Sequence, residues 1–95
     1  MPIAPGSLKC VTVCSSTRPL LPVVEDALRA RVSPADVRRL GESALLVHTE
    51  AEPAGIRDWL APLLEEGESL FVAEFEKWSA YGTAADRDWL LARGH

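Results

Sequence analysis

The sequence predicts an α+β domain of the ferredoxin-like class, a two-layer β-α-β-β-α-β sandwich followed by a short C-terminal helix. Two observations lead to this class. Residues 7–40 and 43–75 form two successive β-α-β patterns, and the second repeats the first at a shift of 34 positions. Each pattern also has a proline near the start of its helix, Pro19 in the first and Pro53 in the second. Such a repeat leaves one face of the sheet covered by helices and the other face open.

The length and composition are those of one small globular domain. A chain of 95 residues can bury roughly 60 to 70% of the surface that it exposes when unfolded, which is enough for one modest core. Hydrophobic residues at 47% and charged residues at 25% are close to globular averages. We therefore expect a single domain over residues 1–95, with a flexible N-terminus over 1–6 and a C-terminal extension over 77–95.

The sequence carries no signal for a membrane or for secretion. No apolar run approaches the ~20 residues that a helix needs to cross a bilayer. The first residues lack the basic segment followed by an apolar segment that is typical of a signal peptide. We expect a cytoplasmic protein that does not bind membranes.

The first half of the chain begins with a strand over residues 8–14, where β-branched and apolar residues alternate with polar ones. The hydroxyls of residues 15–17 are suited to capping a helix that follows. Pro19 and Pro22 then fit the first helical turn, where a missing N–H costs little. Ser33-Pro34 ends this helix.

A hairpin joins the two halves. Residues 37–40 and 43–49 read as strands on either side of Gly41-Glu42. A glycine at the first central position suits a two-residue type II′ turn. The pattern therefore predicts a tight hairpin at this point.

The second half predicts a helix over residues 53–65 and a strand over 69–76. The helix has apolar residues at the spacing of a buried stripe, Ile56, Trp59, Leu60, Leu63 and Leu64. Pro62 removes one helical hydrogen bond and is expected to bend it, and Gly67 is placed to supply a left-handed cap. On the strand, alternation puts one wholly apolar face opposite a half-polar one.

The C-terminal extension is predicted to contain a helix over residues 84–93, because Thr83 and Asp86 have the spacing of a capping box. Its aromatic residues are expected to cover the fourth strand or a partner. The candidate contacts for a dimer or partner are Phe71, Phe75, Trp78, Tyr81 and Trp89.

Cysteine and histidine do not predict a catalytic site. Cys10 and Cys14 lie about 13 Å apart along one strand at ~3.3 Å per residue, too far for a disulfide. His48 corresponds to Cys14 in the repeat, but neighbouring antiparallel strands carry these positions to opposite ends of the sheet. We expect no catalytic residues, no cofactor and no metal site, with Glu74 and Glu76 on a solvated edge or, as the alternative, at a weak site for a hard cation.

Charge is distributed unevenly and leaves a nucleic-acid site as an alternative. Residues 1–48 carry six Lys or Arg and four Asp or Glu (net +2), whereas residues 49–95 carry four and ten (net −6). Electrostatic footprints are local, so a basic patch can exist on an acidic protein. The candidate patch consists of Arg29, Arg31, Arg38 and Arg39.

Three segments carry a resemblance to a known group, namely residues 40–49, 56–63 and 68–72. Together with their surroundings, residues 37–76 resemble the small ferredoxin-fold proteins called SinR-family or CRISPR-associated endoribonuclease-like, which are relatives of the VapD-type toxins. The resemblance implies a homodimer that pairs through the last strand and the tail. Many members also carry an aspartate at the end of the first strand that is proposed to hold a divalent metal for phosphodiester cleavage.

This chain has Cys14-Ser15-Ser16 where those members have the aspartate. A thiol and two hydroxyls do not supply the anionic oxygen that Mg²⁺ prefers. The dimer geometry therefore carries over from the resemblance, and the nuclease activity does not.

The leading hypothesis is a non-catalytic homodimeric binding or accessory protein, of a defence or toxin–antitoxin-like system, with a further protein partner open. The alternative is a nucleic-acid-binding protein or metal-dependent nuclease that uses the arginine patch. A second alternative is a small-molecule enzyme of the dimeric ferredoxin-like barrel type, with His48 in a pocket between helices and sheet.

Overall fold

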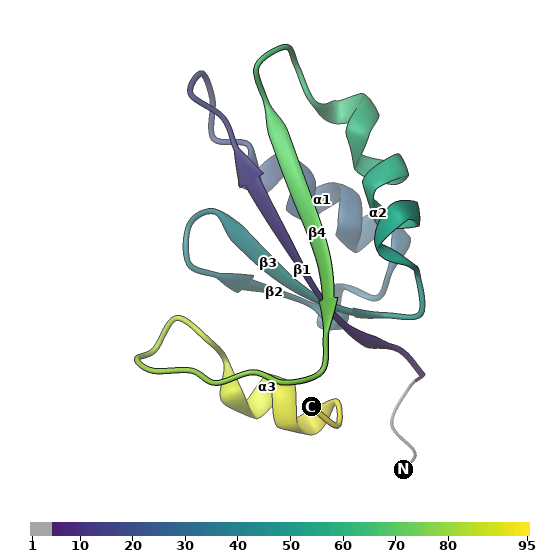
Figure 1. Ribbon diagram of the computed structural model, residues 1–95, viewed down its shortest axis with the longest axis vertical. Helices are drawn as coiled ribbons and strands as arrows, with labels where there is room; N and C mark the ends of the chain where they lie inside the picture. The colour runs from purple at the N-terminus through teal and green to yellow at the C-terminus, as the bar shows by residue number, and fades with distance from the viewer. Residues whose placement is uncertain (1–4) are drawn as a thin grey trace.

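The computed structural model describes residues 5–95, which form four strands and three α-helices (Figure 1). The strands are β1 (Ser7–Cys14), β2 (Val37–Leu40), β3 (Ala44–Thr49) and β4 (Ser69–Phe75). They make one antiparallel sheet in the order β2-β3-β1-β4, so β2 and β4 are its edges. The α+β class predicted from the sequence is confirmed.

The helices are α1 (Leu21–Arg31), α2 (Pro53–Leu60) and α3 (Arg87–Ala92). Short 3-10 turns follow the first two, at Pro34–Asp36 and Ala61–Leu63. Helices α1 and α2 lie on one side of the sheet, and the C-terminal segment with α3 lies at the end where β1 begins and β4 ends (Figure 1). Among residues 5–95, no helix is long and apolar enough to cross a bilayer.

The register of β1 decides which side chains share a face. Leu8 pairs with His48 on β3 and with Phe75 on β4, and Val11 pairs with Leu45 and Val72. Since side chains alternate along a strand, Leu8 and Val11 point to opposite sides of the sheet. Both sides of β1 are therefore apolar.

The larger core lies between the sheet and the helices α1 and α2. The sheet contributes Val11, Val37, Leu45 and Val47, and the chain on the helix side contributes Leu20, Leu21, Val24, Leu28, Ile56 and Leu60. All of these residues are buried. This cluster fixes the position of both helices on the sheet.

A smaller core lies on the other side of the sheet. Leu8 and Leu46 pack there against Trp89 and Leu90 of α3, with Phe75 and Trp78 beside them. The C-terminal segment thus adds a partial third layer to what the sequence predicts as a two-layer sandwich. Trp89 and Leu90 pack on Leu8 of β1 and Leu46 of β3, and the fourth strand takes part only through Phe75 at its end.

The strand boundaries agree closely with the alternation in the sequence, but the hairpin differs from the prediction. The strands expected over residues 8–14 and 69–76 begin and end within one residue of β1 and β4. Leu40 pairs with Ala44, so the hairpin loop has three residues and the expected two-residue turn is wrong. Gly41 still provides the positive φ (71°) at its first position.

The start of α1 differs from the expected capping. Its N-cap is Leu20, without a side-chain hydrogen bond, and Pro22 occupies the first turn as expected. The Ser15 hydroxyl instead accepts hydrogen bonds from the backbone N–H groups of Thr17 (3.3 Å) and Arg18 (3.4 Å). The hydroxyl-bearing segment forms its own turn and leaves the helix uncapped.

Pro62 ends α2 where a bend was expected. The α-helix stops at Leu60, five residues before the expected end at Glu65, and continues as one 3-10 turn. A proline lacks the N–H of the next helical hydrogen bond and its ring crowds the carbonyl four residues earlier. Gly67 (φ 84°) lies in the following loop, where Glu68 N–H donates to the carbonyl of Glu65 (3.0 Å), so it does not cap the helix.

The C-terminal helix is shorter than the predicted span 84–93, and its cap is Asp86 in place of Thr83. The Asp86 carboxylate accepts a hydrogen bond from the backbone N–H of Trp89 (3.0 Å). The expected flexible N-terminus over residues 1–6 falls mostly outside the described residues. Within them, Gly6 (φ 145°) lies so close to the Thr49 backbone that an added Cβ would sit 2.9 Å from its carbonyl carbon.

Replacing Trp89 by alanine should destabilise the protein by about 3–5 kcal/mol, because the indole is 4% exposed and fills the smaller core. The free energy of unfolding from urea titration measures this. The matched control is Leu91→Ala on the exposed side of the same helix, where the side chain is 64% exposed and the change should stay within about 0.5 kcal/mol. Equal effects of the two substitutions would contradict the role given to Trp89.

Candidate functional site

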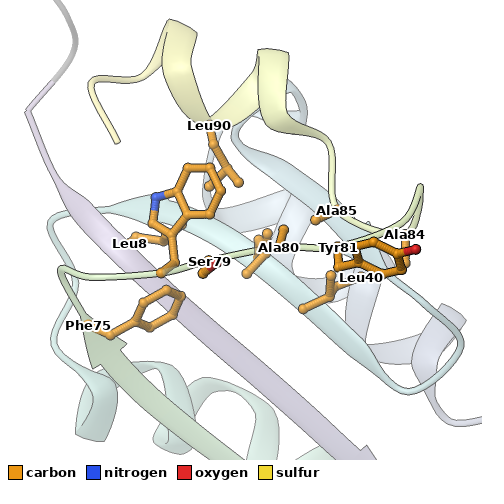
Figure 2. Close-up of a pocket in the computed structure, with 11 residues that line it drawn as sticks. Leu8, Leu40, Phe75, Ser79, Ala80, Tyr81, Ala84, Ala85 and Leu90 are labelled. Atoms are coloured by element: carbon orange, nitrogen blue, oxygen red, sulfur yellow. The ribbon is translucent and has the colours of Figure 1, made fainter.

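The C-terminal segment forms one side of a partly open cavity of about 380 Å³ against the sheet (Figure 2). The floor comes from β1, β2 and β3, one wall from the end of β4, and the cover from residues 78–85 and α3. The lining residues are Leu8, Leu40, Leu46, Phe75, Trp78, Ser79, Ala80, Tyr81, Ala84, Ala85 and Leu90. Figure 2 shows an elongated space, with Leu8 and Phe75 toward one end and Leu40, Tyr81 and Ala84 toward the other.

The lining of this cavity is uncharged and mostly apolar. Of residues 5–95, those that line it include no Asp, Glu, Lys, Arg or His. Its side-chain polar atoms belong to Ser79, Tyr81 and Trp78, and the Trp78 indole N–H already donates to the backbone carbonyl of His95 (3.1 Å). The space suits a neutral apolar molecule better than an ion.

Trp89 and Arg93 attach the cover to the rest of the molecule. The Trp89 indole N–H donates to the carbonyl of Ala35 (2.6 Å), and the Arg93 guanidinium lies over the indole ring, 4.6 Å from its centroid. Arg93 also forms an ion pair with Asp36 (2.9 Å) and donates to the carbonyl of Ala35. These contacts hold α3 on the turn that precedes β2.

A histidine pair holds the last residues. His48 Nδ1 lies 2.8 Å from His95 Nε2, and the His48 side chain is 3% exposed. Burial, then the neighbouring His48 and Arg93, lower the pKa of His95. His48 therefore lies beneath the C-terminal segment and not in a pocket between helices and sheet, where the second alternative needs it.

The five aromatic residues expected at a partner interface take three different positions. Trp89 is buried in the smaller core, and Phe75 and Trp78 are half-buried along the cavity. Phe71 is 66% exposed and Tyr81 is fully exposed. Phe71 and Tyr81 are thus the two whose rings are open to a partner.

Phe71 lies on the edge of the sheet beside a second depression. A groove of about 270 Å³ runs between β4 and α2 and is lined by Pro53, Ala54, Arg57, Leu70, Phe71 and Val72. We call these six residues the β4 edge surface. On the open face of the sheet next to it, Thr12 and Cys14 of β1 are exposed.

The four arginines of the candidate nucleic-acid patch do not share one surface. Arg29 and Arg39 meet at Glu25, at 3.2 and 2.9 Å, and these contacts, Arg39 first, lower the pKa of the Glu25 carboxyl. Arg38 points from the other face of β2 to Asp86 (3.4 Å). Arg31 lies over the Trp59 ring, 5.1 Å from its centroid.

The sequence did not predict one buried lysine, Lys9. Lys9 is 1% exposed, donates to Ser7 Oγ and to the carbonyl of Thr49 (both 2.6 Å), and forms an ion pair with Glu74 (3.2 Å). The hydrogen bond from Ser7, then that from Lys9, lowers the pKa of Glu74. The negative charge of Glu74 is therefore balanced by Lys9 within the molecule. The signal for Lys9 is the strand alternation, which puts it on the same face as Val11.

A second polar cluster joins the loop after β1 to the loop before β4. Arg18 binds the Glu68 carboxylate with two hydrogen bonds (2.8 and 2.7 Å) and donates to the carbonyl of Leu63 (2.7 Å). Ser15 and the backbone N–H of Glu65 also donate to Glu68, both at 2.7 Å. Arg18, then the Glu65 N–H and Ser15, lower the pKa of Glu68 to about 2.

The cysteines are free, and burial raises the pKa of the Cys10 thiol. Cys14 lies at the far end of β1 from Leu8, the residue that pairs with His48, so the structure separates Cys14 from His48 as predicted. Within residues 5–95, no three His, Cys, Asp or Glu side chains are arranged to hold a metal ion.

Comparisons with known proteins give no relative for this chain. No family model, no curated protein and no solved structure matches it.

Glu68→Gln should lower the free energy of unfolding at pH 7 and remove a pH-dependent part of it. Because the pKa of Glu68 falls from its ordinary value of 4.5 to about 2, the folded protein stabilises the carboxylate. That contribution is complete above about pH 5 and is lost as the pH falls toward 2. Urea titrations from pH 7 to pH 2 should show the two proteins converging at the acid end, whereas the exposed neighbour Glu66→Gln should follow the parent protein throughout.

Acidification below about pH 6.5 should weaken the attachment of the C-terminal segment. The pKa of His95 is lowered from 6.5, so the unfolded chain binds a proton more readily than the folded one, and stability falls as the pH drops through this range. Hydrogen exchange of the α3 amides between pH 8 and pH 5 measures the effect after correction for the intrinsic rate. His95→Gln should remove most of the pH dependence, and a parent protein with equal α3 protection across this range would contradict the assignment.

Proposed function

We propose that this protein is a non-catalytic homodimeric binding or accessory protein that associates through the β4 edge surface. The observation that carries the proposal is Phe71, a large apolar ring that is 66% exposed on an edge strand. An edge strand presents unpaired N–H and C=O groups to any strand beside it. Exposed apolar surface next to such an edge favours association.

A second copy of the chain fits this edge. In an antiparallel pairing of two β4 strands about a twofold axis at Val72, Phe71 of each copy lies opposite Ala73 of the other. Glu74 then lies opposite Leu70, so the acidic side chains of the two copies do not face each other directly. The pairing would continue the sheet from one copy into the other.

We further propose that the fold belongs to the ferredoxin-like class. Two features support this: the elements follow in the order β1-α1-β2-β3-α2-β4, and each helix joins strands that have one other strand between them. Assignment to the SinR-like or CRISPR-associated group rests on the sequence resemblance. A nucleic-acid interface has less support, since three of its four arginines pair with Glu25 or Asp86 and the fourth lies on Trp59.

Phe71→Glu should convert the protein from a dimer to a monomer at micromolar concentration. A carboxylate at the centre of the contact loses the apolar burial and brings two like charges close together, which should raise the dimer dissociation constant by roughly thirtyfold or more. Light scattering coupled to gel filtration measures the mass.

The matched control is Leu91→Glu, a change of the same kind at a leucine that is 64% exposed on α3. It should remain dimeric. A strictly monomeric parent protein, or equal dissociation of both variants, would refute association through the β4 edge surface.

A further inference from the structure

We propose that the cavity beneath the C-terminal segment is a binding site for a small neutral apolar molecule of about two aromatic rings. Its volume of about 380 Å³ lies at the lower end of the range of roughly 300–1,000 Å³ for pockets that bind small molecules. A dry cavity of roughly 150 Å³ already holds benzene. The space is thus large enough for two linked or fused rings.

The floor of the site is preformed. Leu8 is 1% and Leu46 is 4% exposed, and both come from the two central strands of the sheet. Leu90 (2% exposed) reaches the cavity from α3, which Trp89 and Arg93 attach to the turn before β2. The apolar side chains beneath the site are therefore held by regular structure, and little ordering would be lost on binding.

Two half-buried aromatic side chains favour an aromatic ligand. Phe75 and Trp78 both line the cavity, and Phe75 lies toward one end of it (Figure 2). Aromatic pairs in offset or edge-to-face arrangements contribute about 0.5–1.5 kcal/mol beyond the area that they bury. The hydroxyl of Ser79, which also belongs to the lining, can hydrogen-bond to a polar atom of the ligand.

Charge argues against an ionic occupant. The residues from 5–95 that line the cavity are all uncharged, and a buried ion without a partner loses several kcal/mol of hydration. The nearest ion pairs lie outside the lining, at Arg38–Asp86 and Arg93–Asp36. An anionic lipid head group or a nucleotide phosphate would find no cation in this space.

The segment above the cavity leaves part of it accessible to a ligand. Residues 76–86 have no helix or strand, and within them Ala80 and Tyr81 lie over the cavity. The polar contacts of this segment include the hydrogen bond from Trp78 to the carbonyl of His95 (3.1 Å), the ion pair of Asp86 with Arg38 (3.4 Å) and the hydrogen bond that Arg87 donates to the carbonyl of Ala80. Ser79, Tyr81 and Ala84 of the lining are exposed, so the space is already open to solvent on this side.

Binding of the neutral naphthalene fluorophore prodan to the full chain tests the proposal. A shift of its emission to shorter wavelength, saturating at one probe for each chain, is expected because the probe leaves water. Methyl resonances of Leu8, Leu46 and Leu90 should shift on binding, whereas those of Leu21 and Leu28 in the larger core should not.

Ala80→Phe should place a ring in the cavity and weaken prodan binding at least tenfold. The matched control is Ala30→Phe, at an exposed alanine of α1, which should bind the probe like the parent protein. Hydrogen exchange of the core amides checks that both variants fold. Absence of saturable binding, equal binding by both variants, or resonance shifts confined to the β4 edge surface would overturn the site.

The cavity shares Phe75 with the edge strand β4 but does not include Phe71. Phe71→Glu should therefore keep prodan binding, and Ala80→Phe should keep the dimer. Loss of probe binding in Phe71→Glu would place the probe at the edge of the sheet. It would refute the cavity site without contradicting the proposed dimer.

Discussion

The structure depends on one constraint, a central strand that is apolar on both sides. Val11 of β1 is completely buried against the helices, and Leu8 of the same strand is 1% exposed beneath α3. A sheet of this kind needs cover on two faces, but the two β-α-β units supply helices for only one. The C-terminal segment provides the other cover, and it reaches only the half of the sheet where β1 begins.

The uneven cover explains where polar contacts concentrate. The C-terminal segment has one helix of six residues, too short to be stable alone, so its position depends on tertiary contacts. Trp89 combines apolar burial with a hydrogen bond to Ala35, and Arg93 adds an ion pair with Asp36 beside it. At the opposite end of the sheet, Arg18 and Glu68 join the two crossover loops. These contacts hold the sheet at both ends, and the part of its face around Thr12, Cys14 and Phe71 stays open.

Local patterns predicted the regular elements, and tertiary contacts decided the rest. Alternation and helical spacing located β1, β4 and the start of α2 within one residue, because those signals arise from the burial that forms the elements. The hydroxyl of Ser15 was expected to cap α1, yet its donor hydrogen is used by Glu68, 53 residues away. Trp89 was expected at an interface, but aromatic area alone does not say whether a ring covers its own sheet or a partner. No local pattern predicts the cavity, since its walls come from four separate segments.

The two proposed binding surfaces follow from the same incomplete cover. Where the C-terminal segment lies on the sheet, side chains of unequal size meet, and the small residues Ser79, Ala80, Ala84 and Ala85 leave space above Leu46. Where the segment does not reach, the edge strand and Phe71 stay in contact with water. Association of two copies would reduce the second exposure. The two surfaces use different parts of β4, Phe75 at its end for the cavity and Phe71 near its start for assembly, so one can serve a ligand while the other serves assembly.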